Sequence, residues 1–302
     1  MNLLDQLNAF QRVAELGSFT HAADLLGWPK GRVSAQVQAL EARLGTRLFH
    51  RTTRRVQLTQ DGLVFHERCR DLLADVDELQ TLFQRDEKAL RGRVRLDMST
   101  GIARQIVMPA LPDLLQRHPG LEVELSSTDR RVDVVREGFD CVLRVGSLAD
   151  SGLVARPLGR YRMLNCASPA YLARHGTPET LDDLAGHRLV HYVTSLGAQP
   201  DGFEHAGPEG PLFVPMAGSV TVNNADAYVA ACRAGLGIVQ VPETGVHELL
   251  AQGALVEVLP RHRPASMPVT LLYANRRQLP RRVQAVMAWL AEQMRPHLEP
   301  WG

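Results

Sequence analysis

The side chains best placed to do chemistry together are cations, gathered between Trp28 and Gln60 of the 302-residue chain. This segment holds seven basic residues but only one acid, Glu41, which gives it a net charge of +6, whereas the whole chain carries +1. The seven are Lys30, Arg32, Arg43, Arg47, Arg51, Arg54 and Arg55. A concentrated basic face on a nearly neutral protein is typical of a surface that binds nucleic-acid phosphates. The segment therefore predicts binding to double-stranded DNA.

Two short helices joined by a tight turn would position these cations. Ser18 or Thr20 can cap the first helix, and Gly27 is placed to end it. The turn is Trp28–Gly31. A second helix is expected over Arg32–Leu44, because apolar residues recur there at spacings of four, three and four and form one stripe. Two helices joined by so short a glycine-containing turn form a helix-turn-helix.

A third helix over residues 2–16 completes this core, and a basic hairpin, or wing, is expected over residues 46–60. Polar side chains at the start of a recognition helix read base edges, whereas basic hairpin residues hold phosphates or enter the minor groove. The expected base readers are Lys30, Arg32, Ser34 and Gln38, with Pro29 and Gly31 shaping the approach. The expected wing contacts are Arg51, Arg54 and Arg55.

A long helix is expected over Asp61–Leu90, ended by Arg91-Gly92. Apolar side chains recur along it at alternating spacings of four and three, which is the a/d pattern of a coiled coil. They are Phe65, Cys69, Leu72, Val76, Leu79 and Phe83. A helix packed on its own domain is the alternative, but it would need a broader apolar face. We therefore predict a homodimer, with a tetramer left open. Two DNA-binding heads held by one dimer would bind a two-fold-related DNA site whose half-sites lie one or more turns of about 34 Å apart.

From Arg93 onward, strands alternate with helices, which is typical of a largely parallel sheet covered by helices. The expected strands are 94–98, 121–126, 141–145, 189–193, 216–222, 237–241 and 269–274, with one or two more in 154–167. The expected helices are 101–116, 132–137, 168–174, 226–234, 244–252 and 281–294. The stretch Gln199–Pro215, with four prolines and three glycines, is predicted to be an irregular exposed loop.

Small ligands of such sheets bind where strands end and helices begin, and free N–H groups there favour anions. The candidates are Ser99, Thr100, Gly101, Ser126, Ser127, Thr128, Gly146, Ser147, Asn223, Asn224 and Pro242. The alternative is that hydroxyl and amide side chains in front of helices are only helix caps. Among these candidates, Ser99 and Thr100 together are the ones we favour.

Several short motifs resemble the N-terminal signature of the LysR-type transcriptional regulators. They are Ala22-Ala23-Asp24, Val33-Ser34, Leu40-Glu41, Leu44-Gly45, Arg47-Leu48-Phe49, Arg51-Thr52 and Leu58-Thr59 with Gly62. The form Arg51-Thr52-Thr53-Arg54-Arg55 resembles one large branch of that family. The later layout of the chain is similar too, so the resemblance covers essentially its full length.

The resemblance implies an α/β fold with an N-terminal winged helix-turn-helix, a long linker helix, and two α/β subdomains similar to periplasmic binding proteins of type 2. The implied boundaries are 1–60 for the winged head, 61–91 for the linker, and 92–302 for the effector-binding domain, with subdomain I at 92–163 and 268–302 and subdomain II at 164–267. It also implies an effector, of unknown identity, bound between the subdomains.

The resemblance implies further that positions 29, 30, 32, 34 and 35 face the DNA groove, which adds Ala35 to the expected contacts. This chain has Ala35 where the family commonly has arginine, and Gly31-Arg32 where small residues or proline are common. We therefore expect Arg32 itself to contact phosphate or guanine.

Other classes of function find little support in the sequence. His187 and His191 are four residues apart but lack the glutamate of a zinc-peptidase motif, and Gly235-Leu236-Gly237 lacks the third glycine of a dinucleotide loop. No nucleophile elbow or phosphate-binding loop is present. We predict no enzymatic activity, no cofactor and no metal. The alternative is an enzyme or an exported solute receptor that shares only the C-terminal fold.

The first residues show no secretory signal, and no apolar run approaches the ~20 residues that cross a bilayer. The expected location is the cytoplasm, without a membrane partner. Four cysteines, at 69, 141, 166 and 232, include no Cys-x-x-Cys pair, which favours reduced thiols. A regulator that answers to oxidation through Cys141 or Cys166 is a further alternative.

Overall fold

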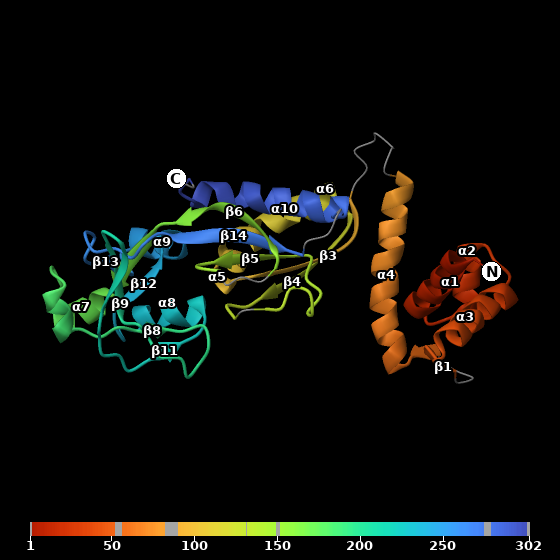
Figure 1. Ribbon diagram of the computed structural model, residues 1–302, viewed down its shortest axis with the longest axis horizontal. Coiled ribbons are helices and arrows are strands. Elements are labelled where there is room, and N and C mark those ends of the chain that lie inside the picture. Colours follow the sequence, from red (N-terminus) through yellow and green to blue (C-terminus); the bar gives the residue numbers. More distant parts are fainter. Residues whose placement is uncertain are drawn as a thin grey trace. The chain divides into compact units, whose positions relative to one another are not determined.

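The computed structural model describes residues 2–51, 56–81, 90–130, 132–148, 152–274 and 279–300. The chain divides into two compact units, Met1–Arg93 and Val94–Gly302 (Figure 1). The first unit contains both the head and the long helix, and the finer boundary at residue 60 stays a prediction.

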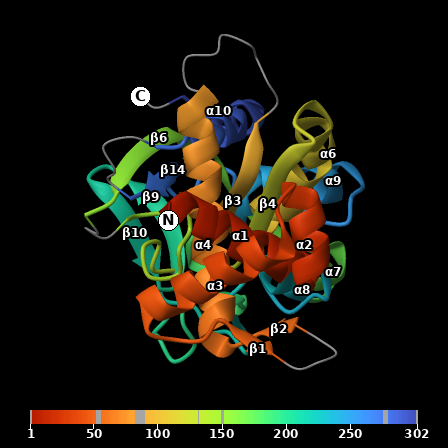
Figure 2. The ribbon, with the colours of Figure 1, turned by 90° about the vertical axis from the view of Figure 1, so that its right-hand side faces the viewer.

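The described part of the first unit consists of helices and one hairpin, which Figure 2 shows. Its elements are α1 (Leu3–Leu16), α2 (Phe19–Leu26), α3 (Lys30–Leu44), β1 (Phe49–Arg51), β2 (Val56–Leu58) and α4 (Gln60–Thr81). β1 and β2 pair antiparallel, with Phe49 opposite Leu58. The winged helix-turn-helix predicted from the sequence is thus confirmed.

The ends of α2 follow the predicted caps. The Ser18 hydroxyl oxygen accepts a hydrogen bond from the His21 N–H at 3.3 Å, and Gly27 ends the helix with φ at +64°. The recognition helix α3 begins two residues before the predicted start at Arg32. The reason is that Pro29 acts as its N-cap, and its carbonyl already accepts the Arg32 N–H at 2.9 Å.

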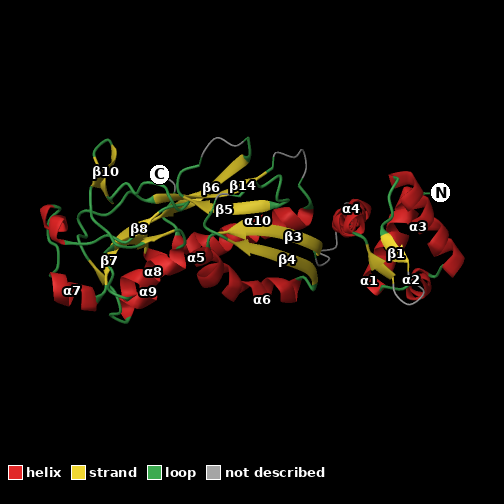
Figure 3. Ribbon diagram, turned by 90° about the horizontal axis from the view of Figure 1, so that it is seen from below, coloured by secondary structure: helices red, strands yellow, loops and turns green. Residues whose placement is uncertain are grey.

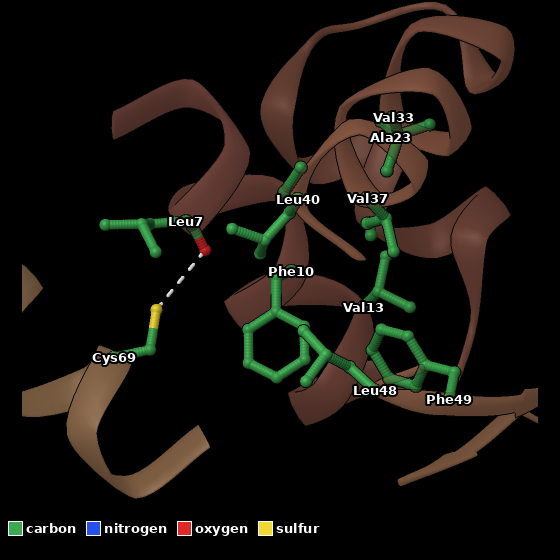
Figure 4. Close-up of a cluster of buried hydrophobic side chains, with 12 residues drawn as sticks. Leu7, Phe10, Val13, Ala23, Val33, Val37, Leu40, Leu48, Phe49 and Cys69 are labelled. Carbon is green, nitrogen blue, oxygen red and sulfur yellow. Dashed lines mark hydrogen bonds between the residues drawn. The ribbon is translucent and has the colours of Figure 1, made fainter. Parts of the chain in front are cut away.

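One apolar cluster joins the helices and the hairpin (Figure 4). The Phe10 ring lies 5.3 Å from the ring of Phe49 and 5.1 Å from that of Phe65, between centroids, so it links α1 to both β1 and α4. The other buried members are Leu7, Ala9, Val13, Ala22, Ala23, Val33, Val37, Leu40, Leu48 and Cys69. Each large side chain buried there contributes about 1.5–3 kcal/mol, which fixes α3 on the head.

The single acid of the basic segment, Glu41, holds the hairpin in place. Its carboxylate oxygen Oε1 accepts the backbone N–H of Leu48 at 2.9 Å and that of Phe49 at 3.2 Å. From the other side, the Thr59 N–H donates to the Leu48 carbonyl at 2.9 Å, and the Thr59 hydroxyl donates to the Arg47 carbonyl at 2.7 Å. The start of the wing is therefore tied to both α3 and the residue before α4.

Thr59 also caps α4, because its Oγ1 accepts the Gly62 N–H at 2.9 Å. A Cβ atom at Gly62 would overlap the carbonyl oxygen of Leu48. Only glycine fits at this position, because the first turn of α4 passes directly over the backbone that leads into β1.

The described part of α4 ends at Thr81, and residues 82–89 of the predicted helix lie outside the described residues. Arg91 and Gly92, which were expected to end that helix, instead begin strand β3 (Arg91–Met98). Most of β3 is buried on both faces. Arginine and glycine are uncommon at the start of a buried strand, so the sequence did not show that β3 already begins at Arg91.

The second unit contains the remaining elements. Its helical pieces are α5 (Thr100–Ile102), η1 (Ala103–Val107), α6 (Met108–Arg117), α7 (Pro169–His175), η2 (Asp182–Gly186), α8 (Ala225–Arg233), α9 (Glu243–Ala251), α10 (Arg281–Met294) and η3 (Arg295–His297). Its strands after β3 are β4 (Gly120–Ser127), β5 (Cys141–Val145), β6 (Val154–Tyr161), β7 (Met163–Ala167), β8 (His191–Tyr192), β9 (Phe203–Gly207), β10 (Gly210–Val214), β11 (Thr221–Val222), β12 (Val239–Pro242), β13 (Val256–Glu257) and β14 (Met267–Tyr273).

Two sheets define the two halves of this unit. Subdomain I is the part built on the five-stranded sheet of order β4-β3-β5-β14-β6, and subdomain II is the part built on the three-stranded sheet β12-β7-β13. The chain passes from the first sheet to the second at Arg162 and returns between Glu257 and Met267.

The sheets are less parallel than predicted. β3 and β5 run parallel, but β14 is antiparallel to both β5 and β6, and β7 is antiparallel to β12 and β13. The reason is the double crossing. Because β14 enters subdomain I from subdomain II and not through a βαβ crossover, it is free to run against its neighbours.

Three further expectations need correction. The helix over 101–116 contains a π-helical turn, η1, just before Pro109, and residues 132–137 form no helix but a hydrogen-bonded turn in which the Glu137 N–H donates to the Asp133 carbonyl at 2.9 Å. The predicted loop Gln199–Pro215 holds the antiparallel hairpin β9–β10, which projects from subdomain II (Figure 3). Pro208 lies in the turn, Gly207 ends β9 and Gly210 begins β10, while Pro211 lies within β10, where proline is tolerated because each strand of a two-stranded sheet is an edge strand.

Replacing Gly62 by alanine is expected to lower the melting temperature of the first unit by several degrees or more. The new methyl group would overlap the backbone carbonyl of Leu48, which cannot move aside as a flexible side chain could. Gly31→Ala is the matched control. Gly31 lies in α3 with nothing within 4 Å of an added Cβ, so alanine there should stabilise the helix by up to about 1 kcal/mol. Thermal unfolding followed by circular dichroism measures both. Equal stability of the two variants would contradict the packing described.

Candidate functional site

The first candidate surface is the exposed face of α3. Lys30, Arg32, Ala35 and Gln38 are exposed along it, Pro29 is exposed at its start, and Ser34 is half-buried. The opposite face is buried and consists of Val33, Gln36, Val37 and Leu40. Leu44, predicted to continue that apolar stripe, is 41% exposed, and Gln36 takes a buried place that the sequence did not indicate. The predicted base readers therefore share one accessible face at the N-terminal half of the helix.

Arg32 is held by two neighbours on this surface. Its guanidinium carbon lies 4.1 Å from the centre of the Trp28 ring, and its NH2 group donates to the Asp5 carboxylate at 3.3 Å. Sequence reasoning missed Asp5, because nothing in its position near the chain start signals a contact with Arg32 of α3. Both side chains of this ion pair are substantially exposed, so it is worth less than about 1 kcal/mol. The guanidinium remains free to exchange Asp5 for a DNA group.

Arg54 and Arg55 lie outside the described residues, as does the side chain of Arg51, and their predicted contacts stay predictions.

Two members of the predicted coiled-coil seam do not face outward. Cys69 is only 2% exposed, and its thiol donates to the Leu7 carbonyl at 3.6 Å (Figure 4), while Phe65 packs on Phe10. Both were expected to contact a second copy of the chain. This expectation is wrong for Cys69, because the first half of α4 packs into the core of its own head, whereas Phe65 is half-buried and its contact with a second copy stays a prediction. Leu72, at 47%, and Leu79, at 64%, are exposed, and Val76 is half-buried. Phe83 lies outside the described residues.

The second candidate surface lies where the two subdomains meet. We call it the junction and define it by Thr100, Gly101, Asp129, Asn224 and Ala225. A Cβ atom built on Gly101 at the start of α5 would lie 4.0 Å from the Cβ of Ala225 at the start of α8. The Asn224 side chain caps α8 by accepting the Ala227 N–H at 2.9 Å. Two helix starts, one from each subdomain, therefore face each other.

Asp129 lies between these helix starts. Its carboxylate accepts the Thr100 N–H and the Thr100 hydroxyl, both at 3.1 Å, and the Ala225 N–H at 2.7 Å. Sequence reasoning named Thr100, Gly101 and Asn224 but missed Asp129, although it directly follows the candidate pair Ser127-Thr128. An acid just after a strand end was the signal that could have found it.

The remaining candidates are distributed differently. Thr128 turns inward, where its hydroxyl donates to the buried Asp97 carboxylate at 3.4 Å, and Asp97 is paired with Arg144 of β5. Ser147 and Asn223 are exposed, and Pro242 is the N-cap of α9. Ser99 is the N-cap of α5 without a side-chain hydrogen bond to the helix, and Ser127 ends β4.

A groove of about 1030 Å³ lies elsewhere between the subdomains, and none of the predicted ligand residues lines it. Its cations are partly neutralised from within. Arg104 pairs with Asp226 at 3.0 Å and Arg162 with Glu243 at 3.4 Å.

Comparison with known proteins finds two families that match the two parts of the chain. The family described as bacterial regulatory helix-turn-helix protein, lysR family, matches residues 4–63, and the family described as LysR substrate binding domain matches residues 87–295. The chain belongs to the LysR family of transcriptional regulators. The predicted family and fold class are thereby confirmed, and the LysR family consists of transcription regulators, not enzymes.

Curated relatives and solved structures agree with this membership. The uncharacterized HTH-type transcriptional regulator YhjC of Escherichia coli K12 is 47% identical over 99% of this chain and 100% of its own. The HTH-type transcriptional activator AaeR of the same strain is 33% identical over 97% of this chain and 94% of its own. The structure of CrgA, a LysR-type regulator from Neisseria meningitidis, matches with a TM-score of 0.60 and 28% identity over 96% of this chain and 98% of its own.

In the described part of this LysR regulator, no group of three or more histidine, cysteine or acidic residues is arranged to hold a metal ion, and no helix is long and apolar enough to cross a membrane. His187, considered above for a zinc motif, instead has its Nδ1 3.2 Å from the Tyr171 hydroxyl.

The two cysteines considered from the sequence for a response to oxidation, Cys141 and Cys166, lie in different sheets of this LysR regulator. Cys141 begins β5 in subdomain I and Cys166 lies in β7 of subdomain II. Burial raises the pKa of the Cys69, Cys166 and Cys232 thiols to about 12, and it also raises the pKa of Cys141. Protonated thiols in separate sheets are poor partners for oxidation.

We expect all four thiols of the native protein to resist a disulfide reagent such as dithiobis(nitrobenzoate) near neutral pH, because each is at most 2% exposed and held protonated. After unfolding in guanidinium, four thiols per chain should react at once. Rapid reaction of one or two thiols in the folded protein would contradict this and would revive the redox alternative.

Proposed function

We propose that this protein acts as a homodimer that reads a two-fold-related operator with α3 and the wing, and that a small molecule bound at the junction controls it. The observation that carries the proposal is the exposed, basic N-terminal face of α3 on a tightly packed head. Because its ligand is chromosomal DNA, the cytoplasm is the compartment in which it would work.

The proposed readers are Pro29, Lys30, Arg32, Ser34, Ala35 and Gln38, supported by their exposure on one face. An arginine side chain presents a planar fork of donors that fits the guanine edge, and stacking on Trp28 limits the rotations that Arg32 loses on binding. Arg51, Arg54 and Arg55 are proposed to hold phosphates.

The proposed dimer uses the outward side of α4. Leu72 and Leu79 are seven residues apart, which is one heptad, and both expose large apolar side chains. A partner helix would cover them, with Val76 between. Phe65 and Cys69 instead transmit the position of α4 to the head core, so a dimer formed by α4 would set the spacing of two heads. Whether two dimers then form a tetramer is a separate question for the same experiments.

The proposed effector site is the junction, supported by donors from both subdomains that converge there. An effector that binds the two subdomains with different affinity in two arrangements would shift the population between them, and with it the geometry of the heads.

Selection from randomised duplex DNA with the full-length protein tests this function. The expected product is a pair of two-fold-related half-sites separated by one or more turns of about 34 Å. Recovery of unrelated sequences, with binding that depends on salt alone, would refute sequence-specific regulation.

Arg32→Lys should keep the salt dependence of DNA binding but lose preference for the selected site. Lysine retains the charge and loses the fork, so affinity for the selected site should fall about 5–150-fold while affinity for random DNA is unchanged. Arg43→Lys, in the last turn of α3, is the matched control and should change neither. Titrations by fluorescence anisotropy at several salt concentrations measure both. Equal loss on both DNAs would assign Arg32 to phosphate.

Leu72→Asp should weaken the dimer at least about tenfold, because it buries an unpaired charge in the seam. Leu63→Asp is the control. Leu63 is similarly exposed, at 50% against 47%, but lies nine residues away, which is about half a turn around α4. Sedimentation equilibrium measures the dissociation constants. Dimers of equal strength would show that another surface holds the copies together.

A further inference from the structure

Three elements of the head meet at one guanidinium group, that of Arg32. The residue belongs to α3, and its guanidinium carbon lies 4.1 Å from the centre of the Trp28 ring in the turn. Its NH2 group donates to the carboxylate of Asp5 in α1 at 3.3 Å, across 27 positions of the chain. The guanidinium of Arg32 therefore has a defined place on the surface of the head.

Both supports of this guanidinium belong to well-packed parts of the head. Asp5 lies in the first turn of α1, between the Asn2 side chain that caps the helix and Leu7, which is 3% exposed in the core. Trp28 packs on the same core, and its backbone N–H donates to the Ala23 carbonyl at 3.0 Å. Side chains on rigid elements hold a neighbouring group more precisely than side chains on loops do.

The two contacts restrict different motions of the guanidinium. Stacking on Trp28 holds its plane, and the hydrogen bond to Asp5 limits rotation within that plane. A guanidinium has five N–H donors in a fixed fork, and Asp5 accepts from the NH2 group alone. The remaining donors suffice for a bidentate contact with O6 and N7 of a guanine. An exposed pair of this kind can be exchanged, but Arg32 need not leave Asp5 in order to contact a base.

The charge of Asp5 works against general attraction to DNA. A carboxylate beside the exposed face of α3 weakens binding to phosphates of any sequence. Two other acids of the head have different contacts: Glu41 holds the backbone of the wing, and Glu15 pairs with Arg12 at 2.8 Å. What Asp5 can add is the orientation of Arg32, which matters only where a base edge matches the fork.

We infer that Asp5 is a positioning residue for DNA reading: it stays paired with Arg32 and directs the remaining donors toward a guanine edge. This rests on the proposed function in one respect, namely that Arg32 reads a base. The role is one of specificity, because a phosphate can be bound from many orientations of a guanidinium, whereas the two acceptors of guanine require one.

Asp5→Ala tests the inference in the full-length protein, on the duplex obtained by selection and on random DNA. The ratio of the two affinities should fall at least about threefold, which is part of the about 5–150-fold preference that a complete bidentate contact supplies. Affinity for random DNA should stay the same or rise, because a negative charge is removed. Fluorescence anisotropy measures both affinities.

Glu15→Ala is the matched control. It removes an acid from the same helix and breaks the pair with Arg12, whose members are exposed to nearly the same degree as Arg32 and Asp5. Arg12 is not a proposed DNA contact, so the ratio should not change. Equal changes of the ratio in both variants would overturn the inference. So would an Asp5→Ala variant that binds both DNAs more tightly by the same factor, since Asp5 would then only reduce the attraction to DNA.

A double-mutant cycle asks whether the effect passes through Arg32. In an Arg32→Lys background, Asp5→Ala should leave the ratio unchanged within about twofold, because lysine has no fork to orient. A loss as large as in the unchanged background would contradict the positioning role.

Asp5→Asn replaces the alanine variant if that variant folds poorly. The amide keeps the shape of the side chain, but a neutral acceptor bonds a cation more weakly, so the ratio should fall at least about twofold. An unchanged ratio would count against Asp5.

These outcomes separate the inference from the proposed function. Loss of site preference in Arg32→Lys without loss in Asp5→Ala would refute the role of Asp5 alone. A site preference that survives Arg32→Lys would refute the reading role of Arg32, and this inference with it.

Discussion

The packing of α4 against α1 is the contact on which the DNA-binding half of this protein depends. Phe65 and Cys69 leave the seam and enter the head core, where Phe10 touches both the wing strand and α4. One helix therefore serves two interfaces along its length: its first half belongs to the head, and its outward face at Leu72 and Leu79 remains for a partner. In the proposed dimer, a change in how two α4 helices meet would therefore act on the core that holds the recognition helix.

Helix α3 likewise has one buried side and one exposed side. α3 buries Val33, Val37 and Leu40 and leaves its first turns exposed, while Glu41 uses its carboxylate to hold the backbone of the wing. The acid that interrupts the basic segment thus organises it without reducing the charge at the N-terminal end of α3. Arg32, resting on Trp28, joins the turn to the helix that it begins.

In the second unit, the starts of α5 and α8 meet at the junction, and the Asp129 carboxylate lies between them. Two helix starts approach each other because the chain crosses between its sheets twice, which brings α5 and α8 together from distant parts of the sequence. A carboxylate relieves their repulsion and ties the subdomains at the same time. Elsewhere the subdomains are also joined by the Arg104–Asp226 and Arg162–Glu243 ion pairs and by the hydrogen bond from the Gln105 amide to the Gly245 carbonyl.

The sequence alone determined the winged head, the long helix and the α/β character of the rest, because helix caps, turn residues and apolar periodicity act between near neighbours. It also placed the proposed base readers on one face of α3, since that face follows from the spacing of Val33, Val37 and Leu40. Tertiary structure decided which apolar side chains of α4 turn inward, that β14 runs against its neighbours, and that residues 203–214 pair as a hairpin. The contacts of Asp129 also depend on the tertiary structure, since its carboxylate accepts hydrogen bonds from Thr100, which is 29 positions away in the chain, and from Ala225, which is 96 positions away. These features depend on contacts between segments far apart in the chain, and a local sequence pattern does not show which distant segment packs against it.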